Sequence, residues 1–264
     1  MVEEFKDKNY WALILGGSSG LGYASACKLA QHGMNIIIVH RDRRSEIPNI
    51  EESFDEIRET GVQFESFNVD AIQKEKRASL VSQITEILGK EGKIRTLLHS
   101  IAKGNLKSMT GKEEQLENID FQLTIDAMAL SLYDWTQDIF KAGLFAKDAR
   151  IISFTSEGNK KAWKNYAAVS AAKVTLEALT RNIALEFAPY GIRANCIQAG
   201  ITVTRSFQMI PDNETLHTHA LKHNPFKRLT VPKDVANAVY LLSKDEASWI
   251  TGTIIPVNGG EHLM

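Results

Sequence analysis

A short apolar run that ends in a cluster of glycines places the strongest constraint on how this chain can fold. Residues Tyr10–Leu15 read YWALIL, and GGSSGLG follows directly and opens a segment with the apolar spacing of a helix. In a strand, turn and helix of this kind the first glycine permits the tight turn, the second lets the backbone approach a phosphate, and the third lets helix and strand pack closely. The free N–H groups at the helix start also attract an anion. The motif therefore predicts a dinucleotide site, with Gly16, Gly20 and Gly22 in these three roles.

Six further short apolar runs follow along the chain, and segments with the apolar spacing of helices separate them. We predict strands at residues 10–15, 35–39, 62–69, 96–100, 150–154, 192–197 and 253–257. Strands and helices that alternate in this rhythm form a parallel sheet with helices on both faces. The sequence therefore predicts one α/β domain over residues 1–264, a doubly wound Rossmann fold with about seven strands, whose ligands bind beyond the carboxyl ends of the strands.

The segment 205–229 breaks this alternation. It contains no strand pattern, and Pro211, Asn213 and Pro225 interrupt its helical spacing. We interpret the segment as a mobile lid that closes over the substrate. The apolar side chains that would then contact the substrate are Phe207, Met209, Ile210 and Leu216.

Composition and charge limit the classes of protein that fit the sequence. The chain has 264 residues, 44% of them hydrophobic, and a formal net charge of −1, which gives no long-range attraction to nucleic acid or to an anionic membrane. Its apolar runs are shorter than the roughly 18 residues of a membrane span, and its first residues lack the basic stretch of a signal peptide. Cys27 and Cys196 lie in apolar contexts and fit a reducing compartment. We therefore expect a soluble, cytoplasmic protein that binds neither nucleic acid nor membrane.

The residues after the second strand bear on the choice between two nicotinamide cofactors. An acidic side chain there binds the ribose 2′-hydroxyl of NADH, whereas basic side chains accommodate the 2′-phosphate of NADPH. The chain reads HRDRR at positions 40–44, so three arginines within four positions favour NADPH. Asp42 keeps NADH open as the less favoured alternative. The third strand ends at Asn68 and Val69, where a side chain could contact adenine.

One tyrosine and one lysine share a face of the long helix predicted at 165–187. Tyr166 and Lys173 are seven positions apart, so at about 100° per residue their side chains leave the helix within roughly 20° of each other. A lysine charge beside a phenol lowers the pKa of the phenol, whose hydroxyl can stabilise a carbonyl oxygen that gains charge. The alternative is an interfacial aromatic beside a solvated lysine. Because both residues follow the fifth strand and face the same crevice as the glycine turn, we interpret them as a catalytic pair.

An ordered set of motifs along the whole chain resembles the short-chain dehydrogenase/reductase family. The motifs are the glycine turn, NV at 68–69, the tyrosine and lysine, YGIRAN at 190–195 and VNGG at 257–260. Most members of this family have a tyrosine four residues before the lysine, but Val169 occupies that position here. The spacing Tyr-x6-Lys, together with HSIA at 99–102 and AGITVT at 199–204, resembles the enoyl-acyl-carrier-protein reductase branch of the family.

The resemblance implies a reaction and a set of site residues. Enzymes of this branch deliver hydride to the β-carbon of a 2-enoyl thioester, and a tyrosine displaced by about one helical turn suits the distant thioester oxygen that gains charge. We expect Tyr166 to bind that oxygen, Lys173 to bind the ribose of the nicotinamide, and Ser156 to add a second bond or to line the pocket. No metal is expected. The expected cofactor contacts are Gly16, Ser18, Ser19, Gly20, Leu21, Gly22, Arg41, Arg43, Asn68, Val69, Ser100, Ile101, Ala102, Lys173, Gly200, Ile201, Thr202 and Thr204.

The resemblance also implies partners, and two alternatives stay open. We expect an NADPH-dependent enzyme of fatty-acid or related acyl biosynthesis, with its substrate on acyl carrier protein or coenzyme A. We also expect a homotetramer that forms through the helices at 116–145 and 165–187. Ser156 stands where this branch usually has an aromatic residue and where ketone-reducing members keep a serine, so reduction of a ketone or 3-oxoacyl thioester is the first alternative. The second is a non-catalytic NADP(H)-binding regulator, which would have no need of the tyrosine and lysine.

Overall fold

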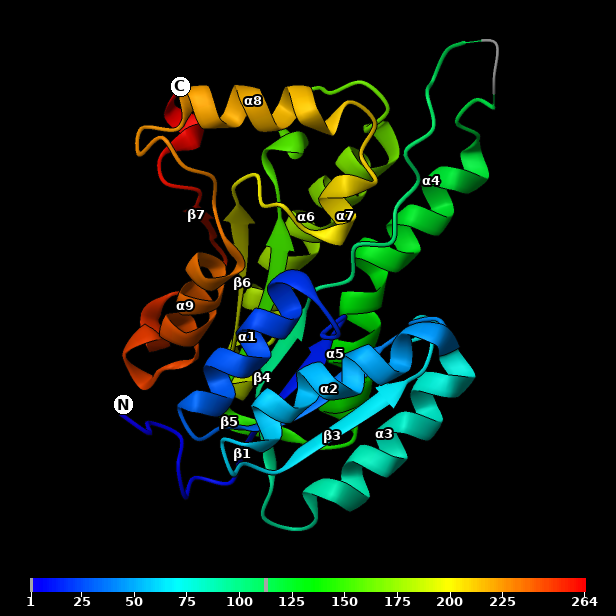
Figure 1. Cartoon of the computed structure of the whole chain (residues 1–264). Coiled ribbons are helices and arrows are strands. Elements are labelled where there is room, and N and C mark those ends of the chain that lie inside the picture. The colour runs from blue at the N-terminus through cyan, green and yellow to red at the C-terminus, as the bar shows by residue number, and fades with distance from the viewer. Residues whose placement is uncertain (1, 112–113) are drawn as a thin grey trace.

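Seven parallel strands form a single sheet at the centre of the protein, whose computed structural model describes residues 2–111 and 114–264 (Figure 1). The strands are β1 (Tyr10–Leu15), β2 (Asn35–His40), β3 (Phe64–Asn68), β4 (Lys93–His99), β5 (Phe145–Thr155), β6 (Ile192–Ala199) and β7 (Ile254–Val257). Their order in the sheet is β3-β2-β1-β4-β5-β6-β7, so the direction of winding reverses between β1 and β4. This arrangement confirms the predicted doubly wound fold, and ligands of such sheets bind at the reversal point.

Helices cover both faces of the sheet because side chains alternate between the faces along each strand. The helices are α1 (Gly20–Gln31), α2 (Ile47–Arg58), α3 (Lys74–Leu88), α4 (Asn118–Ile125), α5 (Ser131–Lys141), α6 (Ala167–Glu186), α7 (Arg205–Gln208), α8 (Asn213–His223) and α9 (Pro232–Ser243). Leu13 of β1 packs in one buried cluster with α3, α5 and α6. Its neighbour Ile14 packs in another with α1, α2 and α9. Within the part of the chain that the structure describes, no helix is long and apolar enough to cross a membrane.

The predicted helical region 116–145 contains two helices and the start of a strand. α4 continues through a π-helical turn at Asp126–Leu130 into α5, which ends shortly before Gly143. Gly143 has a φ of +68°, a left-handed conformation that commonly terminates a helix. The prediction that Phe145 belongs to the helical region was wrong, because the chain turns at this glycine and Phe145 begins β5.

The predicted lid contains two helices that lie beyond the carboxyl ends of β5 and β6 (Figure 1). α7 begins at Arg205, after Thr204, whose side chain caps the helix by accepting a hydrogen bond from a backbone N–H at 3.3 Å. α8 is a regular helix of 11 residues, which the sequence analysis did not predict. Asn213 begins α8 instead of interrupting it, and Pro211 lies outside the helix.

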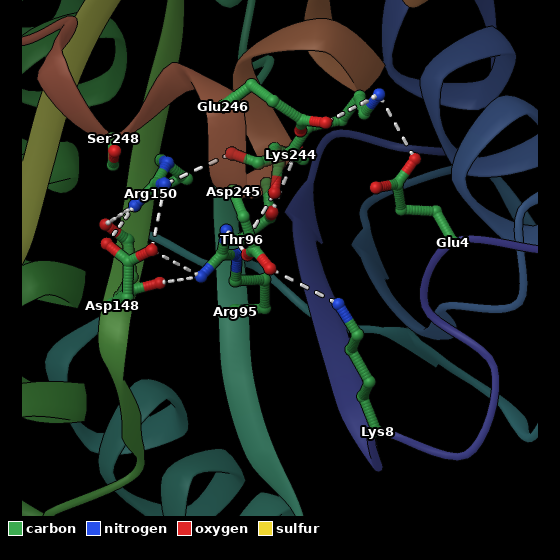
Figure 2. A network of polar contacts seen from close by, with 12 residues as sticks. Glu4, Lys8, Arg95, Thr96, Asp148, Arg150, Lys244, Asp245, Glu246 and Ser248 are labelled. Carbon is green, nitrogen blue, oxygen red and sulfur yellow. Dashed lines mark hydrogen bonds and ion pairs between the residues drawn. The ribbon is translucent and has the colours of Figure 1, made fainter.

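A network of charged side chains joins three strands near their amino ends, away from the ligand-binding edge (Figure 2). Arg95 of β4, Arg150 of β5 and Arg193 of β6 all bind the carboxylate of Asp148. Arg95 Nη1 lies 2.9 Å and Arg150 Nη1 lies 2.5 Å from a carboxylate oxygen of Asp148, and both arginines are only 1% exposed. Asp245, just beyond α9, binds Arg95 at 2.7 Å. The network therefore ties the base of the sheet to the segment that follows α9.

Candidate active site

A cleft of about 530 Å³ opens at the carboxyl ends of the central strands. It brings together residues as far apart in the sequence as Gly16 and Glu261, as the rule for doubly wound sheets predicts. The predicted site residues that line it are Gly16, Ser18, Ser19, Gly20, Leu21, Arg41, Val69, Ser100, Ile101, Ala102, Ser156, Tyr166, Lys173, Gly200, Ile201, Thr202, Thr204, Phe207, Met209 and Ile210.

Four predicted site residues, Gly22, Arg43, Asn68 and Leu216, do not line this cleft. Asn68 holds the backbone of Asp42, which does line the cleft. Its side-chain amide accepts a hydrogen bond from the Asp42 N–H at 2.9 Å and donates one to the Asp42 carbonyl oxygen at 3.1 Å. Gly22 packs against the glycine turn from inside α1. Leu216 lies on α8, outside the lining of the cleft. Arg43 lines an adjoining cavity, and the chain neighbours Leu21 and Val69 line the cleft beside Gly22 and Asn68.

The glycine turn lets the backbone come close to another group. Gly16 has a φ of +84°, and a Cβ atom there would lie 2.6 Å from the Ser100 carbonyl oxygen. A Cβ atom at Gly22 would lie 2.2 Å from the Gly16 carbonyl oxygen. The Ser19 side chain does not cap α1, so the N–H groups of the first turn remain available to an anion. These residues fit the pyrophosphate of a dinucleotide.

Charged side chains of both signs surround the end of the cleft beside β2. A carboxylate oxygen of Asp42 lies 2.9 Å from His40 Nδ1, and Arg41 Nη1 lies 3.3 Å from a carboxylate oxygen of Asp70. Arg43 lines an adjoining cavity of about 540 Å³. The ribose nearest the adenine of a dinucleotide would bind here. The predicted arginines are therefore present at this end of the cleft, together with carboxylates that compete for them.

Tyr166 is held at the start of α6 by a backbone turn and by its neighbours. The residue before it, Asn165, has a φ of +61°. The Tyr166 hydroxyl oxygen lies 3.4 Å from Ser156 Oγ, and its ring centroid lies 5.6 Å from that of Trp163. Burial raises the pKa of Tyr166, and the hydrogen bond with Ser156 offsets this only in part. The expectation that Lys173 lowers this pKa was wrong because burial dominates, so the hydroxyl keeps its proton and can donate a hydrogen bond at neutral pH.

Lys173 lies two turns further along α6, with its amine inside the protein. Nζ donates a hydrogen bond to the Phe154 carbonyl oxygen at 2.7 Å. Burial lowers the pKa of Lys173 to about 8, so the amine still carries its charge at pH 7. Burial and that charge lower the pKa of His99 to about 3 and leave its ring neutral. Lys173 therefore brings a positive charge to the cleft, whereas His99 adds none.

Glu177, which the sequence analysis did not single out, supplies a buried carboxylate beside this lysine. It lies one turn beyond Lys173 on α6 and is 7% exposed. Its Oε1 accepts hydrogen bonds from Thr155 Oγ1, at 2.5 Å, and from Asn159 Nδ2. Because Phe154 and Thr155 are consecutive, the end of β5 holds the ammonium and the carboxylate near each other. Burial lowers the pKa of Lys173, and Cys196 and then Glu177 oppose that effect. The i, i+4 spacing on one helix face was the available signal.

An apolar wall forms one side of the cleft. Met128 of the π-helical turn, Val169 and Tyr166 belong to one buried cluster, against which Trp163 and Ile210 pack. All five residues line the cleft. The position four residues before the lysine is therefore an aliphatic part of this wall and supplies no proton donor. Such a surface suits an apolar portion of a substrate.

Two acidic side chains that were not predicted also line the cleft. Glu157 pairs with Lys161 at 3.0 Å, and a carboxylate oxygen of Glu261 accepts a hydrogen bond from the Ile201 N–H at 3.3 Å. Burial raises the pKa of Glu261, and this hydrogen bond offsets the rise in part. Each of the two follows a motif residue directly in the sequence, Glu157 after Ser156 and Glu261 after the last glycine motif. Adjacency to these motifs was the signal that could have identified them.

The sequence and the structure both resemble known reductases and dehydrogenases. The chain is 30% identical over 269 residues to the 7alpha-hydroxysteroid dehydrogenase of Paraclostridium sordellii, an alignment that covers 98% of this chain and 94% of that protein. It is 29% identical over 257 residues to the 3-oxoacyl-[acyl-carrier-protein] reductase of Staphylococcus epidermidis, covering 97% and 100% respectively. Its fold matches the Bacillus cereus enoyl-acyl carrier protein reductase, solved with NADP⁺ and indole naphthyridinone, with a TM-score of 0.87 at 24% identity over 100% of this chain and 99% of that one.

A family model described as enoyl-(acyl carrier protein) reductase matches residues 16–262, which include the glycine turn, Tyr166, Lys173 and Glu261. The matched span contains nearly the whole chain and every side chain that lines the cleft. The two curated relatives cover the same length. The chain therefore belongs to the short-chain dehydrogenase/reductase family of oxidoreductases.

Proposed function

We propose that the protein reduces the carbon–carbon double bond of a 2-enoyl thioester with NADPH. The observation that carries this proposal is the arrangement on α6, where the Tyr166 hydroxyl reaches the cleft seven residues before Lys173 and buried Val169 fills the nearer position. In a 2-enoyl thioester the hydride adds to the β-carbon, while negative charge develops on the thioester oxygen three bonds away. A hydroxyl that is displaced from the lysine suits that separated oxygen.

The residues of the cleft would hold a dinucleotide along its length. The glycine turn would bind the pyrophosphate, Arg41 and Arg43 the 2′-phosphate, and Lys173 the ribose hydroxyls next to the nicotinamide. When bound, the reduced nicotinamide supplies the hydride. The arginines beside β2 support NADPH over NADH.

Tyr166 and Lys173 would perform different parts of the reaction. As the hydride brings an electron pair to the β-carbon, the electrons of the double bond shift toward the thioester oxygen and form an enolate. Tyr166, which keeps its proton, would donate a hydrogen bond to that oxygen, and a proton from solvent would then join the α-carbon to complete the saturated product. The positive charge of Lys173 would also stabilise the negative charge that develops on the thioester oxygen. One such hydrogen-bond donor contributes about 10²–10³-fold to kcat.

We expect the substitution Glu177→Gln to move the pH dependence of this reaction. In the wild type, kcat/KM should fall as the pH rises above about 8, because Lys173 then loses its proton. Without the neighbouring carboxylate the pKa of Lys173 falls further, so the alkaline limb should move to lower pH. The measurement is kcat/KM across the range from about pH 6 to pH 10. The control is Glu186→Gln, at the exposed end of the same helix. If the Glu177→Gln variant lost activity while the alkaline limb of its pH profile stayed in place, Glu177 would have only a structural role.

The apolar wall and the lid would hold the acyl chain. Met128, Trp163 and Val169 form the wall, and Phe207 and Ile210 of the lid segment line the same cleft. The relative from Staphylococcus epidermidis is named for an acyl-carrier-protein substrate, which supports a thioester on acyl carrier protein and a role in fatty-acid or related acyl biosynthesis.

Reduction of a ketone or 3-oxoacyl thioester is the second candidate, and one contact favours it. The Ser156 hydroxyl lies 3.4 Å from the Tyr166 hydroxyl, so the two could bind a single carbonyl oxygen together. The names of both curated relatives describe reactions at an alcohol or a ketone carbon.

An assay with paired substrates separates the two candidates. Oxidation of NADPH and of NADH is followed by absorbance with crotonyl thioester and with acetoacetyl thioester, each on coenzyme A and on acyl carrier protein. We expect turnover of the crotonyl thioester with NADPH and little with acetoacetyl thioester. Turnover of acetoacetyl thioester alone would replace the enoyl proposal with the second candidate.

We also propose that the protein is a homotetramer. Ile119 and Leu123 of α4, Tyr133 of α5, and Val174 and Leu185 of α6 are apolar or aromatic side chains that the single chain leaves exposed. α4 and α6 pack against each other, and exposed apolar side chains that gather on neighbouring helices support a surface that another chain covers. Light scattering in solution would detect this assembly, and a mass of 29.4 kDa would contradict it.

A further inference from the structure

An ion pair links the lid to the far end of the cofactor cleft. Arg205, the first residue of α7, places Nη2 2.6 Å from Glu46 Oε1 and Nη1 2.9 Å from Glu46 Oε2. Glu46 ends the short 3₁₀ turn that precedes α2. The two residues are 159 positions apart in the sequence, and the paired geometry of two nitrogens on two oxygens is the strong form of this interaction.

The pair lies where the cofactor's 2′-substituent would bind. Arg205, Asp42 and Ser19 line the main cleft and also the adjoining cavity of about 540 Å³, and Glu46 lines that cavity. Arg205 Nη1 is also 3.8 Å from a carboxylate oxygen of Asp42, close to the end of β2. The Arg205 guanidinium is therefore within reach of any anion that enters this cavity.

Carboxylates already pair with two of the arginines at this end of the cleft. Arg41 pairs with Asp70 at 3.3 Å, and Arg205 pairs with Glu46. A ribose 2′-hydroxyl is uncharged and leaves these pairs intact. A 2′-phosphate carries two negative charges at most, so it is repelled by Glu46 and attracted by Arg205, and it binds well only if that arginine turns from the carboxylate to the phosphate.

We propose that Arg205 and Glu46 together determine how strongly the protein prefers NADPH to NADH. Arg205 binds the 2′-phosphate, and Glu46 restrains that preference by competing for the same guanidinium. This inference rests on the proposed function, in which the cleft holds a nicotinamide dinucleotide. Arg205 is the first residue of α7. The lid, and not only the residues that follow β2, would therefore help to select between the two cofactors.

Direct cofactor binding tests the proposal without any substrate. The dissociation constants of NADPH and NADH are measured by calorimetry for the wild type, Arg205→Met and Glu46→Gln. We expect Arg205→Met to weaken NADPH binding by about 10-fold or more and to change NADH binding by less than about 3-fold, because a charge-assisted hydrogen bond to phosphate is lost. Glu46→Gln should instead tighten NADPH binding several-fold and leave NADH binding unchanged.

The chain offers a closely matched control. Arg228, at the other end of the lid segment, pairs with Asp234 at 2.6 Å and 3.1 Å, and its side chain is 59% exposed, against 57% for Arg205. Arg228→Met removes an equivalent pair outside the cleft and should leave both dissociation constants unchanged. Equal effects of Arg205→Met on the two cofactors, or a Glu46→Gln variant that binds NADPH no more tightly, would overturn the inference. Failure of the wild type to bind either cofactor would overturn the proposed function itself.

Discussion

Replacing Tyr166 with phenylalanine is expected to lower kcat for enoyl thioester reduction by about 10²–10³-fold. The substitution keeps the ring that packs among Met128, Val169 and Trp163, and it removes the hydroxyl beside Ser156. Because burial raises the pKa of Tyr166, the lost group is a protonated donor throughout the neutral range. The dissociation constant of NADPH should change far less than kcat, since in the proposed binding mode the glycine turn and the arginines would hold most of the cofactor.

The measurement combines steady-state kinetics with direct cofactor binding. Tyr190→Phe is the matched control, because Tyr190 is 59% exposed and lies outside the cleft. Full activity of the Tyr166→Phe enzyme would contradict the role assigned to the hydroxyl. If the Tyr166→Phe enzyme instead lost activity and cofactor binding to the same extent, the result would place Tyr166 in the cofactor site.

Replacing Asp148 with asparagine is expected to lower the free energy of unfolding by about 2–4 kcal/mol. Removing one partner of a buried ion pair generally costs about 3–5 kcal/mol, and we place the value somewhat lower because the Asp148 side chain is 32% exposed. The asparagine keeps the shape but leaves Arg95 and Arg150, both almost fully buried, without the charge that balances them (Figure 2).

Urea denaturation at two pH values measures this effect and tests its cause. Burial alone would raise the pKa of Asp148, but the hydrogen bonds and charges of Arg150 and Arg95 outweigh it and hold the pKa below its ordinary value. The stabilisation is therefore complete above about pH 4 and is lost as the pH falls through the lowered pKa. Asp55→Asn, which breaks an exposed pair with Arg58 at 2.7 Å, should cost less than about 1 kcal/mol. Equal losses in the two variants would contradict the special role of the buried network.

The sheet could be predicted from the sequence because its strands are short apolar runs bounded by turns. β1 matches the prediction at both ends, and β2 differs by one residue at His40. Prediction was weaker at Phe145, because an apolar residue at the boundary between a helix and a strand fits the spacing of either element. The chain turns at Gly143, and β5 therefore begins at Phe145. The prediction also missed α8, whose polar sequence has little apolar spacing to reveal it.

The candidate site was predictable in its position and in the pair on α6, but less so in its electrostatics. Spacing places Tyr166 and Lys173 on one helix face, whereas burial, which no local pattern reports, reverses the expected direction of the Tyr166 pKa shift. The contact between Arg205 and Glu46 depends on how the lid and the β2 turn meet in space. A contact between residues so far apart in the sequence is seen only once the chain is folded, and no local sequence pattern predicts it.

The charged network lies on the amino side of the cleft, which opens at the carboxyl ends of the same strands. On β5, Arg150 and Thr155 are five residues apart, which corresponds to about 17 Å. Substitutions this far apart that share no partner usually have additive effects. An engineer could therefore select heat-tolerant variants at the base of the sheet and variants of altered substrate specificity at the lid in separate libraries, and then combine the two sets in one protein.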